Sequence, residues 1–258
     1  KVSQAATEWQ NRPLDSLYMI VWMDGLVFKV RENGKVINKT VYLCVGLNKE
    51  GLKEVLGMWI GKNESAAFWM GVLTDLKARG VEDILITVTD NLNGFTETIK
   101  SVFPASTTQI CVVHQIRNSC RYVVWKEKKE FTADLKNIYN APTKEAAEME
   151  LDNFEQKWGA KYPYAIRSWR NNWEELTVFF DFPVEIRKII YTTNLIENLN
   201  GKIRKYTKNK LSFPNDDALK KSVYLAINEI EKKWYQPIWN WALIFNQFIT
   251  IFENRIQV

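Results

Sequence analysis

The sequence predicts an α/β fold built on one mixed sheet, in which three antiparallel strands are extended by parallel strands. An all-helical insertion is expected before the last helix of the core. Two patterns predict this fold: strand-like segments that precede any helix, and a later stretch in which strand signals are weak. The chain has 258 residues, of which 46% are hydrophobic, so it can bury a substantial core.

The first three strands are expected to form an antiparallel meander. Residues 17–30 (LYMIVWMDGLVFKV) are rich in β-branched and aromatic residues, and residues 35–46 and 52–60 follow the same pattern. Turn signals at residues 32–34 (ENG) and 48–51 (NKEG) separate the three segments. Connections this short join antiparallel neighbours, because a parallel pair needs a long crossover.

Helix and strand patterns then alternate. Apolar residues recur at helical spacing in residues 64–80, and residues 84–88 form the short apolar run that is typical of a buried parallel strand. A short amphipathic helix is expected at residues 93–103, and a fifth strand at residues 109–113. Three strands followed by helix, strand, helix and strand is the RNase H-like order, because a Rossmann fold alternates strand and helix from the start.

The second half of the chain is predicted to be helical. Strand signals are weak in residues 115–190, which we interpret as a helical insertion. We expect the RNase H-like core to comprise residues 17–114 and 191–235, after a lead-in of residues 1–16, and an aromatic helical segment to follow at residues 236–258. The individual helices are expected at residues 126–139, 143–158, 169–180, 192–208 and 216–234. Thr143 is the expected N-cap of the second of these, and Ser212-Phe213-Pro214 is expected to break the chain after the fourth.

The composition disfavours some classes of protein and permits others. No apolar run approaches the roughly 20 residues of a membrane-spanning helix, and the first residues show no signal-peptide pattern. Three scattered cysteines suit a reducing compartment. A net charge of +5 and a pI of about 8.9 are compatible with nucleic-acid binding. Because residue 1 is not methionine, we expect the chain to be a fragment of a longer protein.

Eleven tryptophans are unusual for a chain of this length. The simplest interpretation is that they fill helical cores. The alternative is that one or two of them stack on unpaired bases of a nucleic acid, where each stacked base contributes roughly 1–3 kcal/mol.

Two aspartates, Asp24 and Asp90, lie within or directly after apolar strands, where a buried carboxylate costs free energy unless it has a partner. Asp24 interrupts an apolar strand, so either that part of the strand faces solvent or the site offers the carboxylate a partner. Asp90 follows the fourth strand, at the edge where open α/β sheets bind ligands. In the RNase H-like order the first and fourth strands are neighbours, and a divalent cation would relieve the repulsion between the two carboxylates. Oxygen ligands of this kind suit Mg²⁺ or Mn²⁺.

Glu197 is the third candidate acid, on the helix predicted after the insertion. It shares a helix face with Gly201, Arg204 and Lys208, at spacings of 4, 3 and 4 residues. A lone glutamate on a basic helix is more often a solvated ion-pair partner, and the combination with the two aspartates is what favours a catalytic role. The densest basic run of the chain is expected to contact phosphates or to form a solvated helix face: Lys202, Arg204, Lys205, Lys208 and Lys210.

His114 is the single histidine, and it follows Cys111 in a C-x-x-H pair. Even with Cys120 a zinc site here would have three ligands, whereas a structural zinc takes four, so zinc is not expected. His114 and Arg117 lie just past the predicted fifth strand, in the edge zone of Asp90. A supporting or DNA-contacting role is one interpretation, and a buried histidine with its hydrogen bonds satisfied is the other.

The chain resembles the Mutator-type transposases of bacterial insertion sequences, which are related to the eukaryotic Mutator-like elements. The resemblance covers about residues 17–225, and its most specific blocks are C-x-x-H-x-x-R-N and YTTN-x-IE-x-LN in combination. The matching segments include WMDGLVFKVR, VTDNLNGF, QICVVHQIRNS and YTTNLIENLNGKIRKYTKN.

The resemblance implies an activity and a metal site. Asp24, Asp90 and Glu197 match the family's catalytic acidic triad, which implies two Mg²⁺ ions per site, with Mn²⁺ as a possible substitute. Cys111 and His114 match the Cys and His that the family carries after the fifth strand, which implies a supporting role. The implied reaction is metal-dependent phosphodiester cleavage at transposon ends, followed by strand transfer into target DNA.

The resemblance also implies partners and a location. The partners are double-stranded DNA, as terminal inverted repeats and as target, and further copies of the chain in a homodimer or higher multimer, with no membrane partner. The expected location is the bacterial cytoplasm, at the nucleoid. Full-length members carry an N-terminal region that reads the transposon ends, and we expect this chain to lack it. The predicted DNA contacts are His114, Arg117, Asn194, Lys202, Arg204, Lys205 and Lys208.

Two alternatives remain open at this point. The first is a nuclease or resolvase of the RNase H fold, which would cleave DNA without strand transfer. The second is a domesticated, non-catalytic DNA-binding derivative of a transposase, which the presence of all three acids disfavours.

Overall fold

The computed structural model describes residues 1–191 and 194–257. The chain divides into two compact units: the first comprises Lys1–Thr107 and Asn194–Val258, and the second is Thr108–Thr193. The first unit is therefore built from two segments that the second unit separates along the chain.

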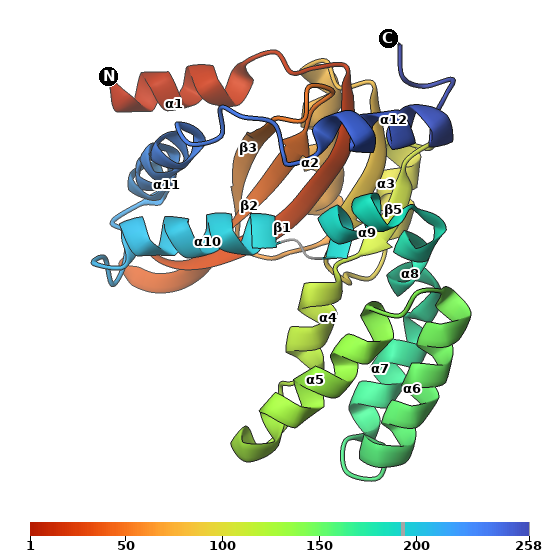
Figure 1. Ribbon diagram of the computed structural model, residues 1–258. Helices are drawn as coiled ribbons and strands as arrows, with labels where there is room; N and C mark the ends of the chain where they lie inside the picture. The colour runs from red at the N-terminus through yellow and green to blue at the C-terminus, as the bar shows by residue number, and fades with distance from the viewer. Residues whose placement is uncertain (192–193, 258) are drawn as a thin grey trace. The chain divides into compact units, whose positions relative to one another are not determined.

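The sheet has five strands in the order β3-β2-β1-β4-β5 (Figure 1). Strands β1, β2 and β3 pair antiparallel, and β4 pairs parallel with β1. This order confirms the predicted RNase H-like fold class. The strands span Leu17–Glu32 (β1), Lys35–Leu47 (β2), Lys53–Gly61 (β3), Asp83–Thr89 (β4) and Thr107–Ile110 (β5).

The predicted turn between the first two strands is confirmed as a two-residue hairpin loop. Glu32 pairs with Lys35, and Asn33 and Gly34 between them have φ values of 50° and 76°. Both values lie in the left-handed region, which asparagine and glycine adopt at low cost and which matches the twist of a hairpin. The hairpin fixes the register between β1 and β2 from Ile20 to Glu32, including the pair Asp24 and Leu43.

Helices α2 (Ala66–Ala78) and α3 (Phe95–Val102) build the core around Trp69. The Trp69 ring is fully buried, with its centroid 5.2 Å from that of Tyr42 on β2 and 4.8 Å from that of Phe95 on α3. Edge-on and tilted ring pairs of this kind add to the stabilisation from apolar burial. Because α3 follows β4 after a short loop, this packing holds the carboxyl end of β4 in place.

Helix α10 (Asn194–Thr207) packs against β1 and against α11 (Asp216–Glu231) (Figure 1). Its buried apolar residues Ile196, Leu199 and Ile203 recur at helical spacing. The predicted break after this helix is confirmed, and Phe213 within it pairs with β1: its N–H donates to the Lys29 carbonyl (2.8 Å), and its carbonyl accepts from the Arg31 N–H (2.8 Å). These bonds tie the end of α10 to the strand that carries Asp24.

The first unit contains two further helices, one near each end of the chain. The lead-in forms α1 (Val2–Asn11), and the aromatic C-terminal stretch forms α12 (Trp241–Ile251). The sequence does not predict α1, which has few apolar residues and, in the structure, buries only Ala6. Within the described residues, no helix is long and apolar enough to cross a membrane.

The second unit is helical apart from its share of β5. The predicted N-cap at Thr143 is confirmed, since its Oγ1 accepts from the Ala146 N–H (3.1 Å). Phe131, Phe154 and Trp158 form its aromatic core. The elements are α4 (Val112–Ser119), the 3₁₀ turn η1 (Trp125–Glu127), α5 (Lys128–Tyr139), α6 (Lys144–Trp158), α7 (Pro163–Asn171), α8 (Trp173–Leu176), the 3₁₀ turn η2 (Val178–Asp181) and α9 (Val184–Tyr191).

Two predicted elements are wrong in their extent. The fifth strand, expected at residues 109–113, spans Thr107–Ile110, and Val112 already begins α4, whose buried face contains Val112, Gln115 and Ser119. Burial of that face overrides the strand preference of two consecutive valines. The helix expected at residues 169–180 is interrupted between α7, α8 and η2.

Gln109 gives a physical reason for the second difference. Its buried side chain donates to the Leu176 carbonyl (2.6 Å) and accepts from the Phe179 N–H (2.8 Å). These two backbone groups need no helical partner, so the chain can leave the helix there without burying unsatisfied polar groups. No local pattern in the sequence reveals such a contact.

Candidate active site

Asp24 lies near the middle of β1 and is buried, with 8% of its surface exposed. Its Oδ1 accepts from the backbone N–H of Gly25 (2.8 Å), and its Oδ2 accepts from Nδ2 of Asn200 (2.7 Å). The alternative of a strand end that faces solvent is therefore wrong. The fold offers this carboxylate hydrogen-bond donors, which offset the cost of burying it.

Asp90 is the first residue after β4 and is half-buried. Its Oδ1 accepts from the backbone N–H of Asn91 (2.8 Å). The last paired residues of β1 and β4 are Trp22 and Val88, and Asp24 and Asp90 each follow two residues later. Because side chains repeat every two residues along a strand, this register brings the two aspartates together.

The two carboxylates offer oxygen atoms within 4.8 Å of each other. At about this separation two like charges repel by roughly 3–4 kcal/mol for an effective dielectric constant of about 20. A divalent cation bound between the two carboxylates would offset this repulsion. Hard oxygen atoms converging at a strand end are a suitable donor set for Mg²⁺ or Mn²⁺.

Helix α10 carries Glu197 and Asn200 three residues apart, and therefore on one face. Asn200 contacts Asp24, whereas the carboxylate of Glu197, which is half-buried, does not lie within 4.8 Å of both aspartates. Glu197 is thus about one helical turn from the residue that contacts Asp24. Its assignment as the third metal ligand stays a prediction.

Asn200 is a site residue that the sequence reasoning missed. Besides its bond to Asp24, its Oδ1 is buried and has no hydrogen-bond partner among the described residues. A buried amide oxygen left in this way is uncommon in a folded chain. The sequence signal for it is the spacing of three from Glu197, which places the two residues on one face of the helix.

The predicted DNA contacts lie in both units. On α10, Arg204 and Lys205 are exposed and Lys202 is half-exposed, while Lys208 follows the end of the helix at Thr207 and is exposed. The sequence predicts that this helix ends at Lys208. The difference of one residue lies within the usual uncertainty of a helix end. The side chain of Asn194 lies outside the described residues.

Three further predicted residues lie on or beside α4 in the second unit. Cys111 precedes the helix and is buried, His114 is half-buried, and Arg117 is exposed. Their supporting and DNA-contacting roles stay predictions.

The strand order, with two aspartates converging across β1 and β4, places the chain in the RNase H-like class of folds. Within that class the chain belongs to the Mutator family of transposases: the family model described as "Transposase, Mutator family" matches residues 1–237. The resemblance found in the sequence is thereby confirmed.

Relatives with curated descriptions come from several bacteria. A probable transposase for an ISRM3-like insertion sequence element of Sinorhizobium fredii is 43% identical over 99% of this chain and 64% of its own length. The transposase of element ISRM3 of Rhizobium meliloti is 44% identical over 98% and 64%. That of IS905 of Lactococcus lactis is 32% identical over 92% and 61%. The chain thus spans less than two thirds of the length of these relatives.

Solved structures show only weak similarity to the chain. The magnesium-bound catalytic core domain of HTLV-2 integrase is 18% identical, covers 57% of this chain and 87% of its own, and has a TM-score of 0.26. The Mos1 transposase catalytic domain with raltegravir and magnesium is 15% identical over 68% and 90%, with a TM-score of 0.24. Scores this low support no conclusion, and the fold is defined by the strand order.

Proposed function

We propose that this chain is the catalytic part of a DNA transposase that cleaves phosphodiester bonds at transposon ends and joins those ends to target DNA. The observation that carries the proposal is the convergence of Asp24 and Asp90, within 4.8 Å, in a chain of the Mutator transposase family. Glu197, on the helix that packs against β1, completes the proposed triad.

The residues present fit a divalent metal site. Asp24 and Asp90 supply the converging oxygen atoms, and the buried Oδ1 of Asn200 is a further oxygen that lacks a protein donor among the described residues. We propose that Asp24, Asp90 and Glu197 hold two Mg²⁺ ions, which Mn²⁺ can replace. Bound there, the ions would activate a water or a DNA 3′-hydroxyl for in-line attack and stabilise the leaving oxygen.

The chain's own groups keep this site in place. The backbone amides of Gly25 and Asn91 each fix one oxygen of the neighbouring aspartate, and Asn200 fixes the other oxygen of Asp24. Orientation of ligands before the substrate binds lowers the cost of reaching the transition state. The reaction then needs no covalent intermediate with the protein.

The partners follow from the same reaction. We propose double-stranded DNA, as terminal inverted repeats and as target, and a dimer or higher multimer of the chain, since two ends must be joined. Lys202, Arg204, Lys205 and Lys208 would hold phosphates of the DNA backbone. His114, Arg117 and Asn194 are the remaining proposed contacts.

Substitution of the two aspartates tests the proposal. Asp24→Asn and Asp90→Ala should each reduce Mg²⁺-dependent nicking and strand transfer on an end-containing duplex by more than about 100-fold, since metal ligation supplies several kcal/mol of transition-state stabilisation. Glu82→Gln is the matched control, because Glu82 is exposed and precedes β4 whereas Asp90 follows it.

Two results would contradict the proposal. Near-normal activity of Asp90→Ala would exclude this site as the catalytic centre. Cleavage by the unsubstituted chain with no strand transfer at any Mg²⁺ or Mn²⁺ concentration would indicate a nuclease of the same fold.

A further inference from the structure

The tryptophans, all eleven of which lie among the described residues, divide into two groups. Nine are buried or half-buried, which accords with the interpretation that they fill cores. Trp125 and Trp239 are 87% and 88% exposed. An indole this exposed contributes little to the core, so these two need a separate explanation.

Trp125 lies in a basic and aromatic surface segment of the second unit. Tyr122 is 65% exposed and Val124 is 44% exposed beside it. Between residues 117 and 129 five basic side chains accompany a single acid, Glu127: Arg117, Arg121, Lys126, Lys128 and Lys129. We call residues 117–129 the Trp125 segment.

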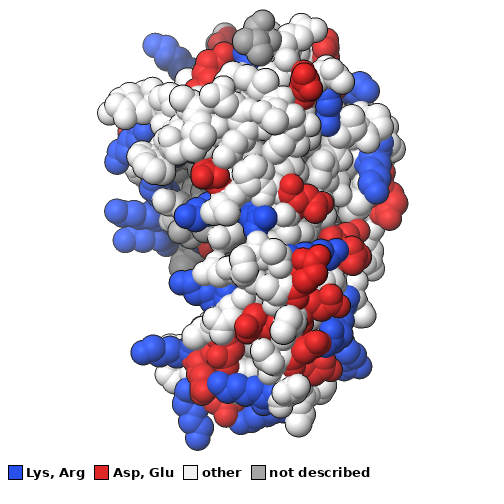
Figure 2. Space-filling view, turned by 45° about the vertical axis from the view of Figure 1, so that its right-hand side comes forward, with Lys and Arg blue, Asp and Glu red and all other residues white. Residues whose placement is uncertain are grey.

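The one acid of the Trp125 segment is already neutralised. Glu127 accepts hydrogen bonds from Lys161 and from the Tyr162 hydroxyl, and the bond from Lys161 holds the pKa of Glu127 below its ordinary value. The carboxylate is thus ionised and paired, and does not cancel the basic side chains around it. Figure 2 shows basic and acidic side chains next to one another on one face of the chain, as in the pairing of Glu127 with Lys161.

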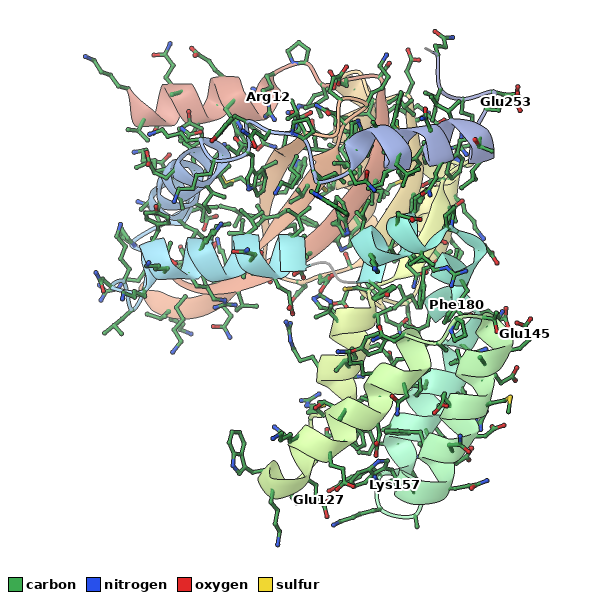
Figure 3. All side chains as sticks on the ribbon, viewed as in Figure 1. Arg12, Glu127, Glu145, Lys157, Phe180 and Glu253 are labelled. Atoms are coloured by element: carbon green, nitrogen blue, oxygen red, sulfur yellow. The ribbon has the colours of Figure 1, made fainter. Side chains whose placement is uncertain are left out.

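The backbone that presents Trp125 is held firmly by the rest of the second unit. The N–H of Val124 donates to the Tyr162 hydroxyl (3.3 Å), that of Tyr122 donates to the Tyr164 hydroxyl (3.2 Å), and Val123 between them is buried. The Tyr164 hydroxyl in turn donates to the Ser119 carbonyl (2.6 Å). Figure 3 labels Glu127 and Lys157 at this end of the unit. The indole is therefore displayed from an ordered turn and not from a loose chain end.

We propose that the Trp125 segment binds DNA with unpaired bases, with a base stacked on the Trp125 indole and phosphates held by Arg121, Lys126 and Lys129. The charge and the flat aromatic face together select this partner. Stacking accepts any base, and basic side chains around an aromatic platform are typical of single-strand binding. This inference rests on the proposed function in one respect, namely that the chain encounters DNA. It does not depend on the proposed metal site.

Trp239 provides a matched control for Trp125. It is equally exposed, but it lies in the first unit, and residues 234–244 contain no charged side chain at all. An exposed indole without neighbouring basic residues should bind nucleic acid poorly. A comparison of the two therefore separates specific stacking from a general effect of removing a surface tryptophan.

The test measures binding of the full chain, without divalent metal, to a labelled single-stranded oligonucleotide and to the duplex of the same sequence. Trp125→Ala should weaken single-strand binding by about five- to 150-fold, the range expected for one stacked base, and leave duplex binding within about twofold. Trp125→Phe should retain most of the affinity, and Trp239→Ala should match the unsubstituted chain. Lys126→Ala should lower the slope of log affinity against log salt by about 0.7.

The outcomes that overturn the inference are specific. If Trp125→Ala weakens single-strand binding no more than Trp239→Ala does, the segment does not stack bases. If Trp125→Ala instead changes the mass of the free chain in sedimentation and leaves DNA binding intact, the segment contacts a second copy. Because no metal is present, failure of the catalytic proposal at Asp24 and Asp90 would not alter either result.

Discussion

At the scale of single residues, we expect the proposed metal site to depend on Asn200 as well as on its acids. Asn200 donates to Asp24 across 176 positions of sequence, from a helix to the central strand. Asn200→Ala should lower the affinity for Mn²⁺ or Mg²⁺ by about 10- to 100-fold, the usual effect of removing a side chain that orients a metal ligand. Metal binding is measured directly by calorimetry, so a loss of activity alone does not decide the result.

The neighbouring Asn198 supplies the control for this prediction. It lies on α10 and is exposed, so Asn198→Ala removes an asparagine from the same helix without touching Asp24. Equal metal affinities of the two variants would show that Asn200 does not position the carboxylate. A lower Mg²⁺ affinity with nearly unchanged turnover at saturating Mg²⁺ is the signature of positioning.

At the scale of elements, the edge of β3 that pairs with no other strand is covered by side chains from α11, from α1 and from Arg12, which follows α1. The Val55 N–H donates to Glu231 on α11 (2.7 Å), the Met58 N–H donates to Gln10 on α1 (2.9 Å), and the Val55 carbonyl accepts from Arg12 (2.7 Å). An uncovered edge strand invites pairing with another chain. Helices α1 and α11 therefore protect the sheet and dock on it through the same bonds.

We expect Glu231 to make the stability of the fold dependent on pH. Burial raises the pKa of Glu231 above its ordinary value of 4.5, so the folded chain binds this proton more tightly than the unfolded chain does. The ionised form of Glu231 thus lowers the free energy of unfolding at pH values above the raised pKa. This destabilisation disappears as the pH falls toward 4.5. Glu231→Gln keeps the acceptor oxygen for Val55 and should flatten this part of the pH dependence of the free energy of unfolding.

Chemical denaturation at several pH values between about 4 and 8 checks this prediction. The free energy of unfolding of Glu231→Gln at pH 7 should equal or exceed that of the unsubstituted chain. Glu229→Gln, at an exposed position of the same helix, controls for the loss of one negative charge. A steeper pH dependence in Glu231→Gln than in the unsubstituted chain would contradict the assignment.

The elements that the sequence predicted correctly are those that depend on residues close to one another in the chain. Strands β1 to β4, the hairpin at Asn33-Gly34 and the cap at Thr143 follow from alternation, turn residues and capping, each of which acts within a few residues. The start of α4 and the breaks around α8 depend on contacts such as that of Gln109 with Leu176, which link distant positions. Likewise Asp24 and Asp90 could be predicted from strand placement, whereas Asn200 required the packing of α10 on β1.

At the scale of the whole molecule, we expect the two aspartates of the proposed metal site to oppose stability, because they repel each other. Asp24 and Asp90 repel each other by roughly 3–4 kcal/mol at an effective dielectric constant of about 20, and screening around the half-exposed Asp90 reduces this to about 1 kcal/mol. Without divalent metal, Asp90→Asn should therefore raise the melting temperature by about 2–4 °C, because it removes one charge and keeps the side-chain shape.

The same variant should lose the response of the melting temperature to metal. A ligand that binds the folded chain alone stabilises it in proportion to the logarithm of its concentration, so Mg²⁺ should stabilise the unsubstituted chain by about 2.7 kcal/mol at 100 times its dissociation constant. Asp90→Asn should gain much less, and Glu82→Gln should respond like the unsubstituted chain. If Asp90→Asn melted lower than the unsubstituted chain without metal, the carboxylate of Asp90 would be a structural group whose contacts outweigh the repulsion. If it also kept the full response to Mg²⁺, the ions would bind elsewhere.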